Sequence, residues 1–169
     1  MKIFRKFRGN AWAAGLLVAA WIVGSTIAHA AIQGITGTNF ALTATTGNVV
    51  TSDGDSFQFW GYAASNFNGG AMCYPGPTLI VNEGDVVTVS LTNQLPVAAG
   101  NTSIVFFGHQ VTAAGGTPGD VAQEAAFGQT VTYTFTAAHP GTYTYRSGDA
   151  SYAYSKCDTV YIKKINPNY

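Results

Sequence analysis

Strict alternation of apolar and polar residues is the feature that most constrains what this chain can fold into. Residues 129–136 have the sequence QTVTYTFT, so Val131, Tyr133 and Phe135 fall on one face of an extended segment and threonines on the other. Residues 86–92 (VVTVSLT) repeat the alternation. A period of two filled with β-branched and aromatic residues is typical of a strand buried on one face.

Further extended segments are expected in the rest of the chain, and Gly, Pro and Asp turn signals separate them. They lie at 40–46, 57–62, 78–81, 102–107, 141–147 and 159–163. In the segment 141–147 we expect both Tyr143 and Tyr145 to face the core. Residues 110–128 are expected to form a loop with at most one short helical turn. About eight short strands without a helical period predict an all-β fold, an antiparallel Greek-key β-sandwich.

The first 30 residues differ in character from the rest. Four basic residues within Met1–Arg8 precede the apolar run Ala11–Ile27, and Ala28-His29-Ala30 follows it. This order is the layout of a secretory signal peptide with an A-x-A cleavage site. An uncleaved membrane anchor is the alternative, although the run is at the short edge of what spans a bilayer. We therefore expect residues 1–30 to be a signal peptide and residues 31–169 to be a single domain.

The net charge argues against two classes of partner. The chain has 8 basic and 8 acidic residues, and four of the basic ones precede residue 31 while no acidic one does. Residues 31–169 thus hold 4 basic and 8 acidic residues, a formal charge of −4. This mild acidity argues against nucleic acid and against anionic membrane surfaces as partners. We expect no membrane contact after cleavage, and a periplasmic or extracellular location.

Residues 74–96 (YPGPTLIVNEGDVVTVSLTNQLP) carry a family resemblance. A Pro-Gly-Pro-Thr turn, a Glu-Gly-Asp turn and an Asn-x-Leu-Pro end follow one another with strands between them. Gly108 and the run Gly141-Thr142-Tyr143 extend the match. This part of the chain resembles the first cupredoxin (plastocyanin-like) domain of multicopper oxidases, and the resemblance implies a cupredoxin-like Greek-key sandwich.

The copper-ligand motifs of that family are degenerate here. The resemblance places the first His-x-His motif of the family at Val105 and Phe107, and the second at Arg146 and Gly148. Val, Phe and Gly offer no lone pair, and a guanidinium is a cation without an acceptor. We therefore expect no cofactor, and would expect copper only if the resemblance outweighed the lost ligands.

Other residues could supply a different metal site. His109, His139 and Cys157 are weak alternative ligands, since a blue-copper centre needs two His and one Cys thiolate. The order of these residues is wrong for a cupredoxin centre, in which a His follows the Cys. The simpler interpretation makes His109 a loop residue and His139 a turn residue.

The two cysteines leave two alternatives open. After export, Cys73 and Cys157 would meet an oxidising compartment, in which a disulfide can form. The other possibility is two separate thiols, because the sequence gives no geometry.

Three functional hypotheses follow from the missing ligands. The first is a non-catalytic binding or assembly module, which is not an enzyme by itself. The second is a degenerate or truncated component of a copper-dependent oxidase. The third is a structural subunit that assembles through exposed strand edges. The expected partners are other cupredoxin domains or copies of the chain itself.

Overall fold

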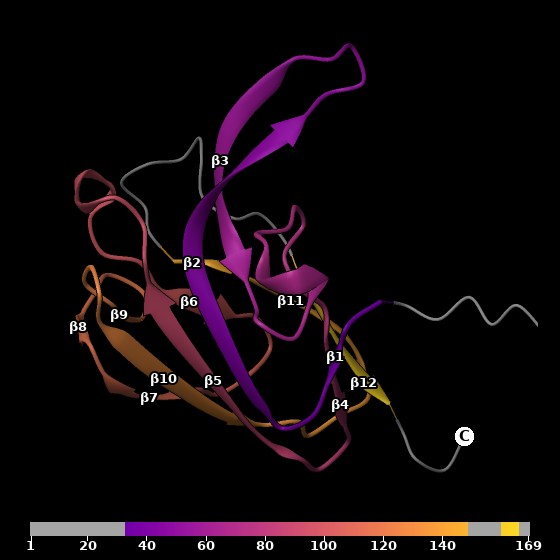
Figure 1. Cartoon of the computed structure of the whole chain (residues 1–169). Coiled ribbons are helices and arrows are strands. Elements are labelled where there is room, and N and C mark those ends of the chain that lie inside the picture. Colours follow the sequence, from indigo (N-terminus) through magenta and orange to yellow (C-terminus); the bar gives the residue numbers. More distant parts are fainter. Residues whose placement is uncertain (1–32, 149–159, 166–169) are drawn as a thin grey trace, which may run out of the picture. The chain divides into compact units, whose positions relative to one another are not determined.

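The structure is a computed structural model that describes residues 33–148 and 160–165 (Figure 1). The predicted signal peptide lies outside these residues and stays a prediction, as does the single domain at 31–169. Within the described residues no helix is long and apolar enough to cross a bilayer. The elements are β1 (Ile35–Thr36), β2 (Asn39–Val50), β3 (Ser56–Ala63), the 3-10 turn η1 (Asn68–Gly70), β4 (Leu79–Asn82), β5 (Val86–Asn93), the 3-10 turn η2 (Val97–Ala99), β6 (Ile104–Phe106), β7 (Thr112–Gly115), β8 (Thr117–Pro118), β9 (Gln123–Glu124), β10 (Thr130–Thr136), β11 (Gly141–Ser147) and β12 (Val160–Ile165).

Two five-stranded sheets form a sandwich. One sheet has the strand order β1-β4-β12-β11-β6 and the other has the order β3-β2-β5-β10-β7. Strands β8 and β9 form a small separate ribbon. Three pairs are parallel, namely β1 with β4, β4 with β12 and β2 with β5, and the remaining pairs are antiparallel. The predicted all-β sandwich is confirmed. Most of its strand pairs are antiparallel, as expected, and the three parallel pairs join strands that are not consecutive in the sequence.

The segment 110–128 differs from the expectation of a loop. It contains β7, which pairs with β10, and the ribbon of β8 and β9. The expectation of a loop with at most one short helical turn was wrong because Ala and Gly dominate β7, and these residues give no alternation of large apolar side chains. The pairing depends on the neighbouring strand β10, which a local pattern does not reveal.

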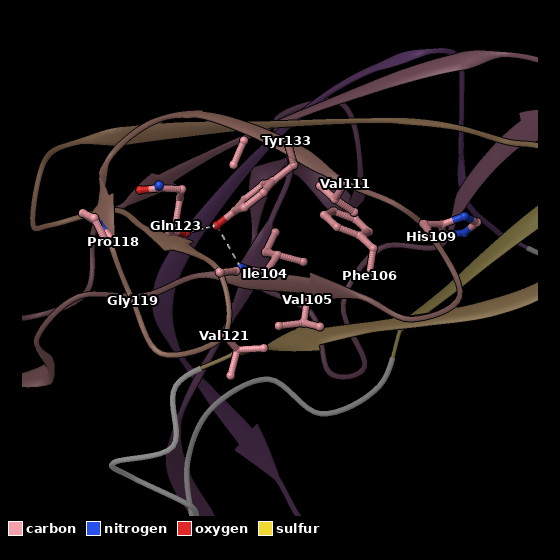
Figure 2. Close-up of a pocket in the computed structure, with 12 residues that line it drawn as sticks. Ile104, Val105, Phe106, His109, Val111, Pro118, Gly119, Val121, Gln123 and Tyr133 are labelled. Carbon is pink, nitrogen blue, oxygen red and sulfur yellow. Dashed lines mark hydrogen bonds between the residues drawn. The ribbon is translucent and has the colours of Figure 1, made fainter.

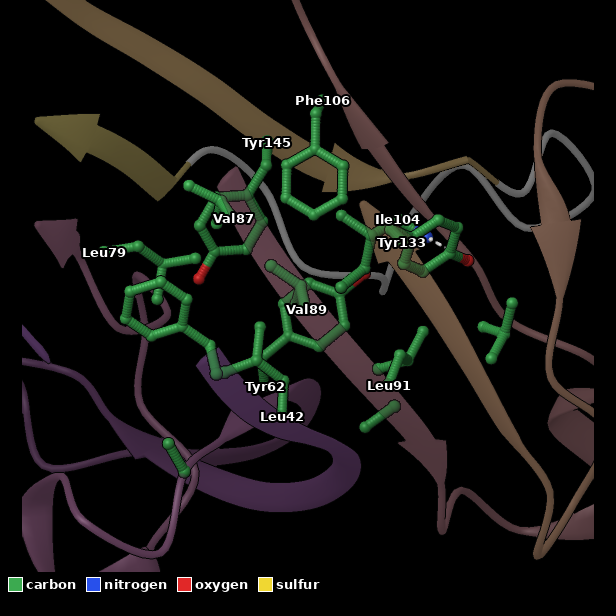
Figure 3. Packing of buried hydrophobic residues seen from close by; sticks show 14 of the residues in the cluster. Leu42, Tyr62, Leu79, Val87, Val89, Leu91, Ile104, Phe106, Tyr133 and Tyr145 are labelled. Atoms are coloured by element: carbon green, nitrogen blue, oxygen red, sulfur yellow. Dashed lines mark hydrogen bonds between the residues drawn. The ribbon is translucent and has the colours of Figure 1, made fainter. Parts of the chain in front are cut away.

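The core lies between the two sheets, as Figure 3 shows. Val131, Tyr133 and Phe135 of β10 are buried, as their alternation predicts. They face buried side chains of the other sheet, among them Phe106 of β6, whose ring centroid is 5.0 Å from that of Phe135. Burial of large apolar side chains of this kind is the main favourable contribution to folding.

Tyr145 is completely buried, as expected, but Tyr143 is only half-buried. The ring of Tyr143 packs against the core cluster and lies 4.7 Å from the ring of His109, and its hydroxyl donates to the carbonyl of His139. Both tyrosines therefore contact the core, as expected, although Tyr143 is only partly buried.

The turn motifs of residues 74–96 hold backbone groups in place. Asp85 accepts a hydrogen bond from the amide of Asn82 at 2.9 Å, which closes the Glu-Gly-Asp turn. Asn93 is fully buried, and its side-chain amide donates to the carbonyls of Gly100 and Ala125. Because buried backbone acceptors need partners, Asn93 fixes the chain on both sides of β6.

Candidate functional site

Two of the degenerate motif positions lie on the neighbouring strands β6 and β11, and the other two directly follow these strands. Strand β6 pairs with β11 in a register that places Val105 opposite Arg146. The amide of Phe107 donates to the carbonyl of Thr144 at 3.0 Å, which continues the pairing by one residue. The fold therefore brings together the residues that the family resemblance singled out from two distant parts of the sequence.

Phe107 and Arg146 contact each other across this surface. The guanidinium carbon of Arg146 lies 4.8 Å from the centroid of the Phe107 ring. Arg146 is exposed, and 40% of Phe107 is exposed. An exposed cation–π contact of this kind contributes about 0.5–1 kcal/mol. The pair fills the outer part of the surface with an aromatic ring and a fixed positive charge.

Val105 and Gly148, the other two motif positions, are partly buried. A β-carbon added to Gly148 would lie 2.6 Å from Oγ of Ser103 and 2.8 Å from Cγ2 of Val105. Real β-carbons do not approach other atoms this closely. The structure therefore has no room for a larger side chain at Gly148 unless Ser103 and Val105 move.

Copper does not fit these four residues. A copper ion needs imidazole, thiolate or thioether ligands, and the side chains of Val105, Phe107, Arg146 and Gly148 provide none. The cationic head of Arg146 would also repel a metal ion. In residues 33–148 and 160–165, no group of three His, Cys, Asp or Glu side chains could hold a metal ion.

The structure brings together two of the three alternative ligands. His109 and His139 both line a cavity of ≈ 370 Å³, together with Thr136 and Tyr143. The ring of His109 stacks on Phe135, with centroids 4.6 Å apart and planes 17° apart. Cys157 lies outside the described residues, so the weak alternative set of three ligands stays untested.

Cys73, the other half of the possible disulfide, is half-buried beside η1. The side-chain amide of Asn68 donates to its sulfur at 3.3 Å. Cys73 has no disulfide partner within the described part of the chain, to which Cys157 does not belong. The disulfide between Cys73 and Cys157 stays a prediction.

A larger cavity lies beside Val105 and was not predicted from the sequence. It measures ≈ 480 Å³, and Figure 2 shows the residues of β6, β10 and the segment 111–123 that line it. Val105, Val111 and Val121 contribute apolar surface, and 65% of Val121 is exposed. The hydroxyl of Tyr133 donates to the carbonyl of Gln123 and accepts from the amide of Ile104. The only sequence signal was a pair of valines in a segment rich in Gly, which is too weak to indicate a cavity.

Comparison with known proteins agrees with this architecture. The family model described as multicopper oxidase matches residues 51–162 of the chain. Among solved structures, a multicopper oxidase is 27% identical with a TM-score of 0.53. A copper nitrite reductase from Nitrosomonas europaea is 23% identical with a TM-score of 0.57, and a multicopper oxidase from the hyperthermophile Aquifex aeolicus is 18% identical with a TM-score of 0.57. The latter two likenesses show the fold alone.

The matches cover most of this chain and a smaller part of the other proteins. Alignments to these three structures cover 80%, 79% and 80% of this chain, and 46%, 43% and 29% of the respective matched chains. The chain thus spans less than half the length of each of them. No curated protein matches the sequence.

Proposed function

This chain belongs to the multicopper oxidase family, and from that membership we propose that it is an exported, non-catalytic binding module whose copper half-site has been replaced by a packed surface. The observation that carries the proposal is the contact between Phe107 and Arg146, together with the lack of room at Gly148, where an added β-carbon would clash with Val105. These four residues occupy the family's ligand positions with groups that donate no electron pair to a metal. Export is supported by the basic, apolar and A-x-A segments of residues 1–30.

Copper loading tests the absence of the oxidase site. Protein made by expression of the full chain is incubated with copper and dialysed, and copper per chain is measured by elemental mass spectrometry. We expect much less than one copper per chain and no oxidation of a phenolic substrate. One tightly held copper per chain, or oxidase activity, would overturn the proposal.

A variant that restores two imidazoles serves as the positive control. Val105 and Arg146 are directly opposite in the β6–β11 register, so V105H/R146H places two histidines about 4.5–5.5 Å apart between β-carbons. This variant should retain more copper than the wild type in the same assay. The comparison shows that the assay detects a metal bound at this surface.

The binding role is supported by the cavity beside Val105. A volume of ≈ 480 Å³ lies within the range of about 300–1,000 Å³ of small-molecule sites. Most of the side chains that line it are apolar, although slightly more than half of the exposed lining surface is polar, and the Tyr133 hydroxyl is already engaged by Gln123 and Ile104. We therefore propose a small molecule with an apolar part as the ligand, because Val105, Val111 and Val121 would contact that part.

An apolar fluorescent probe tests this ligand class. Anilinonaphthalene sulfonate should gain fluorescence with the wild type, and V121W should reduce the gain by filling the cavity. The matched control is V97W, since Val97 is 73% exposed and does not line the cavity. Equal fluorescence for V121W and the wild type would contradict binding in this cavity.

A second candidate function is a component of a larger copper oxidase. It is favoured by the length of the chain, which covers less than half of the oxidases it matches. In this case other cupredoxin domains would supply the copper ligands. Co-purification from the native host of a protein with intact His-x-His motifs would favour this function over an independent module.

A further inference from the structure

The outer half of the hairpin formed by β2 and β3 extends past its sheet (Figure 1). Strand β2 pairs with β5 only over residues 39–44, whereas its pairing with β3 continues to Val50. In the described part of the chain, residues 45–50 therefore pair on one side only. A two-stranded ribbon by itself is marginally stable in water, so this extension gains from a further strand or surface.

The outer edge of β3 is open for such a strand. Strand β3 is the last strand of its sheet, and among the described residues its outer side carries one isolated bridge, from Tyr62 to Cys73. That bridge lies at the inner end of the strand. Toward the turn, Ser56–Phe59 presents an edge that no other described strand pairs with.

One face of the extension is apolar and partly exposed. The register places Val49 opposite Phe57 and Gly47 opposite Phe59, so these residues share a face. Phe59 packs edge-on against Tyr74, with ring centroids 4.7 Å apart. Phe57 is 49% exposed. We call Val49, Phe57, Phe59 and Tyr74 the hairpin patch.

The strands of the extension lack the usual protection of an edge. Residues 45–50 and 56–63 contain no Lys, Arg, Asp, Glu or Pro. Natural edge strands are commonly protected by charges or prolines against pairing with other chains. The only charges of the hairpin extension are Asp53 and Asp55 in its turn, where the hydroxyl of Thr51 donates to Asp53 and lowers the pKa of that carboxyl.

We propose that β3 pairs with β3 of a second copy of this chain, antiparallel about a two-fold axis through Phe57. In this arrangement Ser56 lies opposite Gln58 of the second copy, and the two Phe57 rings meet at the axis. A two-fold interface is self-complementary, so the same patch serves both copies. The inference goes beyond the proposed function and does not depend on it.

Charge favours this occupant and this orientation. An uncharged strand with an aromatic face has no charge with which to attract a strongly charged partner. A second copy of the same strand is equally uncharged and apolar, so the two copies match in polarity. Antiparallel pairing places each Asp55 opposite Phe59 of the other copy. The two Asp55 residues are then about 13 Å apart along the strands, beyond the Debye length of about 8 Å at physiological salt. Parallel pairing would place the acidic turns side by side.

Sedimentation analysis over a range of concentrations tests the pairing. Protein from expression of the full chain should shift from the mass of one chain to the mass of two. F57K places a charge on the axis and should raise the dissociation constant by at least about tenfold. V97K is the matched control, because it places the same charge on an exposed valine in η2 and should dimerise like the wild type.

A second measurement tests the place of the contact. In a background with Cys73→Ser and Cys157→Ser, a nitroxide label on Gln58→Cys should show dipolar broadening from the second copy, and a label on Val97→Cys should not. A wild type that stays monomeric at all concentrations would overturn the proposal. Self-association that F57K leaves intact, for example through the apolar segment 11–27, would also overturn it. A label at position 58 that shows no dipolar broadening would do the same.

Discussion

Two buried tyrosine hydroxyls connect the sheets of the sandwich. Tyr62 of β3 donates to the carbonyl of Ser103 at 3.1 Å, just before β6 in the opposite sheet. Tyr133 of β10 accepts from the amide of Ile104 at 3.1 Å and donates to the carbonyl of Gln123. Buried backbone groups that lose their partners are costly. These hydroxyls therefore fix the position of β6, which carries half of the degenerate motif.

Replacing Tyr133 with Phe tests this anchoring. Y133F keeps the ring in the core but removes a partner from both Ile104 and Gln123. We expect the free energy of unfolding to fall by about 1–3 kcal/mol, the usual cost of leaving buried polar groups unsatisfied. Urea unfolding followed by circular dichroism measures the change.

The control for this variant is Y74F. Tyr74 is 56% exposed, so removal of its hydroxyl should change the stability by no more than about 0.5 kcal/mol. Equal stability of Y133F and the wild type would show that the two hydrogen bonds do not hold β6 in place.

At the scale of single elements, local alternation decided what could be predicted. The strand β10 was predicted because Val131, Tyr133 and Phe135 mark one face every second residue. Strand β7 was missed because its sequence, TAAG, contains no large apolar side chain. Of the four motif positions that the family resemblance singled out, Val105 and Arg146 are paired on β6 and β11, and Phe107 and Gly148 directly follow these strands. The contact of Arg146 with Phe107 was not predictable, because it depends on the register between β6 and β11.

The close packing beside β6 leads to a prediction about Gly148. G148A would bring a methyl group to 2.6 Å from Oγ of Ser103, and we expect a loss of about 1–3 kcal/mol from overpacking. The hydroxyl of Ser103 is buried and has no hydrogen-bond partner in the described structure. S103A should therefore be close to neutral alone and should restore part of the stability of G148A.

A double-mutant cycle measures this coupling. The unfolding free energies of the wild type, S103A, G148A and S103A/G148A are compared, and contacting residues should be non-additive by about 0.5–3 kcal/mol. Additive effects within about 0.5 kcal/mol would mean that the close approach at Gly148 does not limit the size of the side chain there.

At the scale of the whole molecule, the predicted disulfide would join two distant segments. Cys73 lies between β3 and β4, and 83 residues separate it from Cys157. In the chain-entropy model, a cross-link over a loop of this length stabilises the fold by about 4–5 kcal/mol. The local alternative is a thiol held beside η1, where the amide of Asn68 donates to the sulfur of Cys73 at 3.3 Å.

We expect the exported protein to carry the disulfide, because an oxidising compartment allows it to form and the chain has no other cysteine. Alkylation of the unfolded, unreduced protein should modify neither sulfur, and a reducing agent should then lower the free energy of unfolding. C73S/C157S is the matched control, since reduction should leave its stability unchanged. If both cysteines of the unreduced protein react with the alkylating agent, the sulfurs are separate thiols and Cys73 keeps only its contact with Asn68.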